Sequence, residues 1–327
     1  MTLVHAHERS AFRSLGRLLA ATALLAFGQI TLGVLVRVTG AGLACPDWPL
    51  CYSQAVPIFN APIFTQWAYR VASLVLGLVL AATLVRLTTV AALRRVFALP
   101  GLLALGLLLA ELALAGMAVQ RDLPPALVGA HFVGSLLLFS LLVAMAMHAR
   151  RLATQTPPRP GTSAPVPPVP RTLRTWLAAT TGLVMLQAVA GNMAANQARG
   201  SIICRGTSAC RTVWGAPAWL EISHRSLGLL TVLAVVGLTV AAARTRLPPL
   251  VRLTLRVLPS LVALEAVLGI VNVYYNLPIW ADAGHAWIAA LTYSLLLVTT
   301  LDLQLSTTGG MTPPGLTVTR SLSATGA

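Results

Sequence analysis

Eight long apolar segments constrain the fold of this chain more than any other feature. They lie at residues 15–37, 68–92, 101–119, 126–148, 174–195, 219–243, 257–275 and 284–304. About twenty apolar residues in an α-helix cross the hydrocarbon core of a bilayer, which is roughly 30 Å thick. In lipid, only helices and closed barrels satisfy all backbone polar groups. The sequence therefore predicts an all-α polytopic membrane protein with eight transmembrane helices.

Composition supports a lipid environment and argues against nucleic-acid binding. Of the 327 residues, 57% are hydrophobic and 9% are charged, and the mean hydropathy is +0.80. A soluble domain carries about a quarter charged residues, so the lipid bilayer is the expected surrounding of most of the chain. The net charge of +15 comes from arginines, since there is no lysine. They lie between apolar segments and form no basic face, so we expect no nucleic-acid partner.

The arginines also predict the orientation. Sixteen of the 23 lie in the two terminal tails and in the loops that follow the second, fourth and sixth apolar segments. Positively charged loops stay on the cytoplasmic side. We therefore expect a multi-pass protein of the cell membrane with both termini in the cytoplasm and the remaining loops outside.

A segment rich in proline and arginine divides the chain. Residues 149–173 have no apolar periodicity and read as a cytoplasmic linker. It separates an N-terminal four-helix half, residues 1–148, from a C-terminal four-helix half, residues 174–304. The tail, residues 305–327, is rich in Thr, Gly and Ser, which predicts disorder.

The two halves resemble each other as a diverged repeat. Glu111 and His131 recur as Glu265 and His285, 154 residues later. The Leu-Pro dipeptide at 123–124 recurs at 277–278 with the same offset. Residues 66–70 align with 221–225, and the Gln-x-x-x-Gly at 29–33 aligns with that at 187–191. Because four helices return the chain to its starting side, the halves run in the same direction. This predicts two parallel-repeat four-helix bundles.

Three histidines share one membrane depth. His131, His224 and His285 each lie in the first turns of an even-numbered apolar segment, and all these segments start from the outer face. An ionisable side chain inside a membrane usually points into the bundle toward a partner, and a single one could simply bond a neighbouring helix. Paired imidazoles in four-helix bundles are typical heme ligands, so His224 and His285 predict one heme iron in the C-terminal half. Arg225 is a candidate partner of a heme propionate, or otherwise an interfacial anchor.

The N-terminal half departs from this pattern. His131 is present, but Tyr69 stands where the repeat predicts a histidine, and Gln66 stands where it predicts a carboxylate. Tyrosine can bind heme iron as a phenolate, or it can be a plain interfacial aromatic; we favour the second. The carboxylates Glu111 and Glu265 could handle protons or bind a neighbouring helix.

The four cysteines form two pairs in predicted outer loops. They are Cys45 with Cys51 and Cys204 with Cys210, each pair with five residues between partners. An outer location lets disulfides persist, so we predict two loop disulfides; two pairs of free thiols are the alternative. The pair at 45 and 51 could be a structural staple or a redox relay, and we favour the staple.

Residues 33–51, GVLVRVTGAGLACPDWPLC, closely resemble the first outer loop of the heme A synthase family. The E-x-x-H-R element at 221–225 resembles the family too, as do His131 and His285 at the starts of their helices. The resemblance implies an oxidoreductase with heme b bound by His224 and His285. It also implies an N-terminal site that binds heme O and oxidises its C8 methyl group to the formyl group of heme A. Implied partners are the heme O synthase (protoheme farnesyltransferase) and cytochrome oxidase assembly factors.

Within that family, E-x-x-H-R also opens the second helix, and here the segment reads Gln66-Trp67-Ala68-Tyr69-Arg70. The resemblance thus places His131, Tyr69 and Gln66 at the catalytic site. It also assigns cofactor binding to Arg70, as to Arg225. The missing histidine and carboxylate leave a catalytically impaired heme-binding assembly or carrier protein as the alternative. A di-heme quinol oxidoreductase and a transporter are less favoured, because three well-placed histidines are too few for the first and unexplained by the second.

Overall fold

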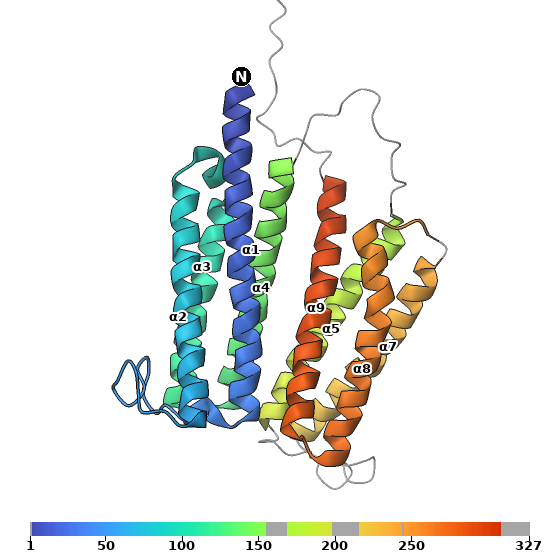
Figure 1. The fold of residues 1–327 in the computed structure, drawn as a ribbon. Helices are drawn as coiled ribbons and strands as arrows, with labels where there is room; N and C mark the ends of the chain where they lie inside the picture. The colour runs from blue at the N-terminus through green and yellow to red at the C-terminus, as the bar shows by residue number, and fades with distance from the viewer. Residues whose placement is uncertain (1, 155–168, 198–215, 244, 309–327) are drawn as a thin grey trace, which may run out of the picture.

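The computed structural model describes residues 2–154, 169–197, 216–243 and 245–308. Within these ranges, eight helices are long and apolar enough to cross a membrane, as the sequence predicted. They stand side by side and run lengthwise through the molecule (Figure 1). The chain is therefore a multi-pass membrane protein.

The helices run along the chain in the following order. The first four and one short 3-10 turn are α1 (Thr2–Val38), η1 (Ala41–Leu43), α2 (Ala61–Thr88), α3 (Ala91–Gln120) and α4 (Pro125–Thr154). Among the described residues, the second half of the chain has α5 (Arg171–Gln197), α7 (Ala216–Ala242), α8 (Pro249–Tyr275) and α9 (Ile279–Thr308).

Several helix boundaries differ from the prediction. The second apolar segment was expected to end at residue 92, but α2 ends at Thr88 and α3 already begins at Ala91. Pro100 and Pro259, where helix starts were expected nearby, lie inside α3 and α8, because proline is tolerated in membrane helices when neighbours satisfy the freed backbone group. Apolarity marks the stretch that crosses lipid, whereas the helices continue into the polar interfaces.

The linker and the tail also begin and end differently. Residues 149–154 continue α4, residues 171–173 start α5, and α9 continues to Thr308. Both ends of the predicted linker, 149–173, and the start of the predicted disordered tail, 305–327, are therefore helical. The predicted boundaries of these two segments were wrong. Residues 155–168 and 309–327 lie outside the described residues.

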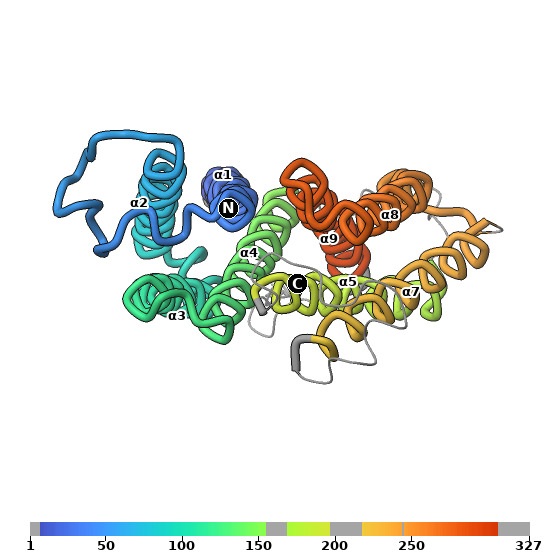
Figure 2. Tube along the Cα trace, turned by 90° about the horizontal axis from the view of Figure 1, so that it is seen from below, coloured from blue at the N-terminus to red at the C-terminus, as the bar shows by residue number. Residues whose placement is uncertain are grey.

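Helices from each half pack mainly with their own half. α1 contacts α2 and α4, and α3 contacts α2 and α4; α5 contacts α7 and α9, and α8 contacts α7 and α9. Contacts between the halves run through α1, α4, α5 and α9, which meet in the middle of the molecule (Figure 2). The hydroxyl groups of Ser140 and Tyr293 lie 2.6 Å apart across this contact. The division into two repeated bundles stays a prediction.

One backbone feature supports the repeat directly. The turns that precede α4 and α9 carry two consecutive residues with left-handed φ angles, Asp122 and Leu123 in one and Asn276 and Leu277 in the other. In each turn the second residue donates its N–H to the carbonyl five residues earlier, at 2.7 and 2.9 Å respectively. This is the helix-ending geometry of the Schellman type. The offset of 154 residues thus relates local structure as well as sequence.

Candidate functional site: two histidine centres at one end of the helices

The three predicted histidines lie in the first turns of α4, α7 and α9, all of which start at the end of the molecule where α1 finishes (Figure 1). The structure brings two of them together. The rings of His224 and His285 have centroids 6.1 Å apart and planes at 83°. We call these two residues the histidine pair.

Each imidazole of the histidine pair is held by the protein through Nδ1. In His224, Nδ1 lies 3.1 Å from the carbonyl oxygen of Gln187 on α5. In His285, Nδ1 lies 2.7 Å from a carboxylate oxygen of Glu265 on α8, a close contact that is not aligned as a hydrogen bond. A ring that donates from Nδ1 keeps its lone pair on Nε2, and metal-binding histidines are commonly oriented in this way.

The spacing of the histidine pair fits a shared iron. Metal–imidazole bonds are about 2 Å long, which places the centres of two axial rings roughly 6 Å apart. Gly191 on α5 also belongs to this site, because a Cβ atom there would come within 2.6 Å of the His224 ring. In the described part of the chain, no group of three or more His, Cys, Asp or Glu side chains gathers as a metal cluster. The two imidazoles could therefore supply nitrogen ligands to a heme iron.

The N-terminal half builds a similar frame with a different partner. Nδ1 of His131 lies 3.1 Å from a carboxylate oxygen of Glu111 on α3, and Ser135 donates its hydroxyl proton to the same oxygen. The hydroxyl of Tyr69 lies 2.9 Å from Nε2 of His131. Tyr69 therefore faces the histidine, and our interpretation of it as a plain interfacial aromatic was wrong.

A cavity of about 690 Å³ surrounds this centre and will be called the N-terminal cavity. His131, Tyr69, Gln66 and Arg70 all line it, so the structure brings together the four residues predicted for the substrate site of this half. Gln66 is buried, and its side-chain oxygen has no hydrogen-bond partner among the described residues. Its neutral amide can position a ligand, but it cannot accept a proton as the expected carboxylate would.

The loop between α1 and α2, residues 39–60, closes one end of the N-terminal cavity and will be called the disulfide loop. The predicted Cys45–Cys51 disulfide is present and both cysteines are buried. Trp48 and Leu50 of this loop line the cavity. Cys204 and Cys210, the second predicted pair, lie outside the described residues.

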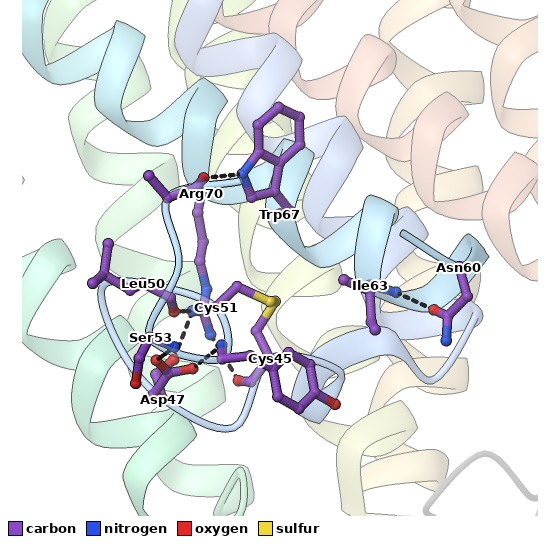
Figure 3. Close-up of a disulfide and its surroundings, with 11 residues drawn as sticks. Cys45, Asp47, Leu50, Cys51, Ser53, Asn60, Ile63, Trp67 and Arg70 are labelled. Atoms are coloured by element: carbon purple, nitrogen blue, oxygen red, sulfur yellow. Dashed lines mark hydrogen bonds between the residues drawn. A yellow bond between two sulfur atoms is a disulfide. The ribbon is translucent and has the colours of Figure 1, made fainter. Parts of the chain in front are cut away.

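Arg70 holds the disulfide loop in place (Figure 3). Its guanidinium donates to the carbonyl oxygens of Asp47 at 2.6 Å and Cys45 at 2.9 Å, and also to that of Leu50. These contacts give Arg70 a loop-binding role that the sequence did not reveal. Its predicted role in cofactor binding stays a prediction.

The carboxylate of Asp47 organises the same loop from within. It accepts the backbone N–H groups of Tyr52 and Ser53, each at 2.6 Å. The hydrogen bond from Ser53, with that from Tyr52, holds the pKa of Asp47 below its ordinary value. Tyr52 and Ser53 have left-handed φ angles of 54° and 59°, so both N–H groups converge on one side of the turn.

Sequence reasoning missed Arg37 and Asp282. Arg37, near the end of α1, lines the N-terminal cavity and forms a two-pronged ion pair with Asp282 on α9, at 2.8 and 2.9 Å. Asp282 precedes His285 by one helical turn. An arginine in the last turn of an apolar helix needs a partner, so the sequence could have marked Arg37 as a paired residue. It could not identify the partner, which is 245 residues away.

Arg225 forms an ion pair with Glu221 at 3.2 Å, one turn earlier on α7. This contact joins the glutamate and the arginine of the E-x-x-H-R element on the side of the helix that also carries His224. A role of Arg225 toward a heme propionate stays a prediction.

Comparison with known proteins identifies the family of this chain. Residues 16–298 match the family described as cytochrome oxidase assembly protein. A heme A synthase from Geobacillus kaustophilus (strain HTA426) is 33% identical over 122 residues, which are 36% of this chain and 38% of that relative. This alignment thus spans well under half of the curated relative. The family match spans nearly all the transmembrane helices, and the chain therefore belongs to the family of cytochrome oxidase assembly proteins.

Proposed function

We propose that this protein is a heme A synthase-type oxidoreductase, which converts the C8 methyl group of heme O into the formyl group of heme A for cytochrome oxidase. The observation that carries the proposal is the duplicated frame of glutamate and histidine. Glu111 with His131 and Glu265 with His285 make the same contact at equivalent positions of the two halves. One protein thus has two histidines, each beside a glutamate at equivalent positions of the two halves, which suits one cofactor site and one substrate site.

The C-terminal centre is the proposed heme b site. His224 and His285 would hold the iron, and Gln187 and Glu265 orient the two rings through Nδ1. Heme iron supplies the one-electron redox chemistry that amino-acid side chains lack. The protein would contribute the two imidazole ligands and the carboxylate beside one of them, and ligand identity and neighbouring hydrogen-bonding groups both tune a heme potential.

The N-terminal cavity is the proposed substrate site. His131 is its one imidazole among the described lining residues. Glu111, which accepts the Ser135 hydroxyl proton, lies 3.1 Å from Nδ1 of this ring. The disulfide loop, pinned by Arg70, covers one end and limits the access of water. Excluding water from such a site strengthens its electrostatic interactions and suppresses side reactions.

The orientation follows the arginine distribution, with both termini in the cytoplasm of a cell-membrane protein. In this orientation the disulfide loop and both centres lie near the outer face, where the Cys45–Cys51 bond can persist. Heme O would come from the heme O synthase, and the product would pass to cytochrome oxidase assembly factors.

Tyr69 and Gln66 favour a second candidate, a heme-binding assembly or carrier protein with impaired catalysis. The phenol engages Nε2 of His131, and the amide of Gln66 leaves the site without the expected proton acceptor. The two candidates share the fold and the C-terminal heme. They differ in whether heme O is changed after it binds.

Co-expression with a heme O-producing farnesyltransferase, followed by extraction and chromatography of the hemes, distinguishes them. The oxidoreductase proposal predicts formyl heme with the parent protein and none with His131→Ala. A folded, heme-loaded parent that yields no formyl heme contradicts the proposal. Gain of formyl heme by the double variant Gln66→Glu with Tyr69→His would then establish the carrier.

A further inference from the structure

A second hollow lies on the lipid-facing side of the N-terminal half. It has a volume of about 390 Å³ and runs along the seam between α1 and α2. Five of its ten lining residues come from each helix, and Gln29 alone among the ten carries a side-chain amide. We call it the seam groove.

The seam groove opens toward the bilayer. Leu24 on α1 and Val75 on α2, which line it, are 71% and 41% exposed on helices long and apolar enough to cross a membrane. Gly28 forms part of its wall, and a Cβ atom at Gly28 would meet no atom within 4 Å. The groove thus has space for additional apolar atoms without moving any side chain.

The groove adjoins the N-terminal cavity. Gln29, Trp67 and Val71 line both, so the two hollows lie next to each other on either side of these three side chains. Both polar residues among the three are fixed from the cavity side. The Gln29 amide donates to the Tyr69 carbonyl at 3.1 Å and to the Ser73 hydroxyl at 2.5 Å, and the Trp67 indole donates to the Ala55 carbonyl at 2.7 Å.

The dimensions suit a single extended chain. Lining residues span positions 24–32 on α1 and 67–75 on α2, which corresponds to about 12 Å along each helix at 1.5 Å per residue. A hydrocarbon chain is much narrower than a porphyrin ring, so it is the better match for a seam between two packed helices. The groove leads from the level of Trp67 toward the middle of the membrane.

We propose that the seam groove binds the isoprenoid tail of a farnesylated heme whose porphyrin occupies the N-terminal cavity. This assignment rests on the proposed function and identifies the feature by which the site separates a tailed heme from protoheme. The tail follows the seam between α1 and α2 in contact with lipid, and the ring lies beside His131. A lipid acyl chain has similar chemistry, but it is not attached to a porphyrin in the adjoining cavity, so its binding would not depend on His131.

The test is a binding comparison between heme O and protoheme, which lacks the tail, followed by Soret absorbance of the purified protein. The part of the Soret absorbance that disappears in His131→Ala measures heme bound in the N-terminal cavity. Gly28→Leu fills the groove, and Gly106→Leu on α3 is the matched control, because a Cβ there also meets no atom within 4 Å. Val75→Phe fills the groove from α2, and Val85→Phe, 63% exposed on the same helix, is its control.

The parent and both control variants should bind heme O more tightly than protoheme by about tenfold or more. Gly28→Leu and Val75→Phe should lose this preference while their affinity for protoheme stays unchanged. Retention of the preference by both folded groove variants would overturn the groove assignment alone. If the parent loses its preference for heme O in phosphatidylcholine nanodiscs, lipid acyl chains occupy the groove. This result would also overturn the groove assignment. Absence of any His131-dependent binding of heme O by the parent would instead contradict the proposed function.

Discussion

The hydroxyl of Tyr69 lies 2.9 Å from Nε2 of His131. At the equivalent place in the C-terminal half, the ring of His224 faces His285. The two centres thus share a carboxylate-held histidine and differ in the group across from it. A phenol within hydrogen-bonding distance of the imidazole leaves no room for an iron between them, so binding of a heme iron by Nε2 of His131 would require Tyr69 to leave this contact.

Replacing Tyr69 by histidine should convert the N-terminal centre into a copy of the C-terminal one. We expect Tyr69→His to bind substrate heme with two imidazoles, giving a six-coordinate low-spin spectrum, whereas the parent has one imidazole at this centre. Electron paramagnetic resonance of the ferric protein measures the change. Tyr69→Phe is the control, because it removes the hydroxyl without adding a nitrogen. Identical ferric spectra for the parent and Tyr69→His would show that residue 69 does not face the iron.

The ion pair between Arg37 and Asp282 should stabilise the contact between α1 and α9. Both side chains are largely buried, at 20% and 13% exposure. Removing one partner of a buried pair leaves an uncompensated charge, so Arg37→Ala should lower the free energy of unfolding by about 2 kcal/mol or more. Thermal unfolding in detergent, with Asp282→Asn and the double variant, measures the coupling.

The pair of Arg151 and Asp302 offers a matched comparison. It joins α4 and α9, but its atoms lie 3.5 Å apart and its side chains are 29% and 34% exposed. Exposed pairs contribute about 0–1 kcal/mol. Arg151 also donates to the Asp302 backbone carbonyl at 2.8 Å, so the carboxylate is the side to change, and Asp302→Asn should have a smaller effect than Asp282→Asn. Equal losses from the two variants would contradict the stabilising role of the inner pair.

Arg70 should control access to the disulfide. Its hydrogen bonds to three loop carbonyls are charge-assisted, and such bonds contribute about 1.5–3 kcal/mol each. Arg70→Gln should therefore raise the rate at which an external thiol reduces Cys45–Cys51 by about tenfold or more. Arg86→Gln, near the other end of α2, should leave the rate unchanged. Mass spectrometry after alkylation follows the reduction, and equal rates in both variants would remove Arg70 from this role.

The acid sensitivity of the disulfide loop should depend on Asp47. Its pKa is lowered in the folded protein by the N–H groups of Ser53 and Tyr52, so its contribution is present above the ordinary aspartate value of about 3.9 and is lost as the pH falls through the lower folded value. Reduction by a phosphine should accelerate in the parent as the pH falls below about 4. In Asp47→Asn the rate should be higher at neutral pH and independent of pH over the same range. A parallel pH dependence in both proteins would exclude Asp47.

The sequence predicts the eight membrane-spanning helices well, because the length of each apolar segment determines them. It also predicts that the three histidines lie near the same end of the molecule, because successive helices alternate in direction. It places His224 and His285 on helices that start at one side, and the structure brings their rings together. The glutamates could be matched between the halves by spacing, but their contacts with His131 and His285 could not, since the rotation of each helix about its axis depends on packing. The repeat aligned Tyr69 with His224, yet spacing alone could not show that its hydroxyl meets His131.

Contacts made by loops and between distant helices were beyond prediction. Arg37 and Asp282 are 245 residues apart, and nothing local to either one indicates the other. Arg70 read as a ligand-binding arginine because of its place in the repeat, whereas the fold of the disulfide loop gives its guanidinium three carbonyl acceptors. Helix ends were misplaced for a related reason: caps and turns at the interfaces, and not apolar length, determine where α2 and α3 meet.

The central claim is that His224 and His285 hold one iron between α7 and α9. The most direct measurement is the optical and pyridine-hemochrome spectrum of the purified protein beside four alanine variants, at His224, His285, His131 and His148. His148 is a control, because it packs against Phe97 near the other end of α4. We predict a six-coordinate b-type heme that is lost in His224→Ala and His285→Ala and kept in His131→Ala and His148→Ala. A colourless protein, or full heme content after removal of both His224 and His285, would contradict the claim.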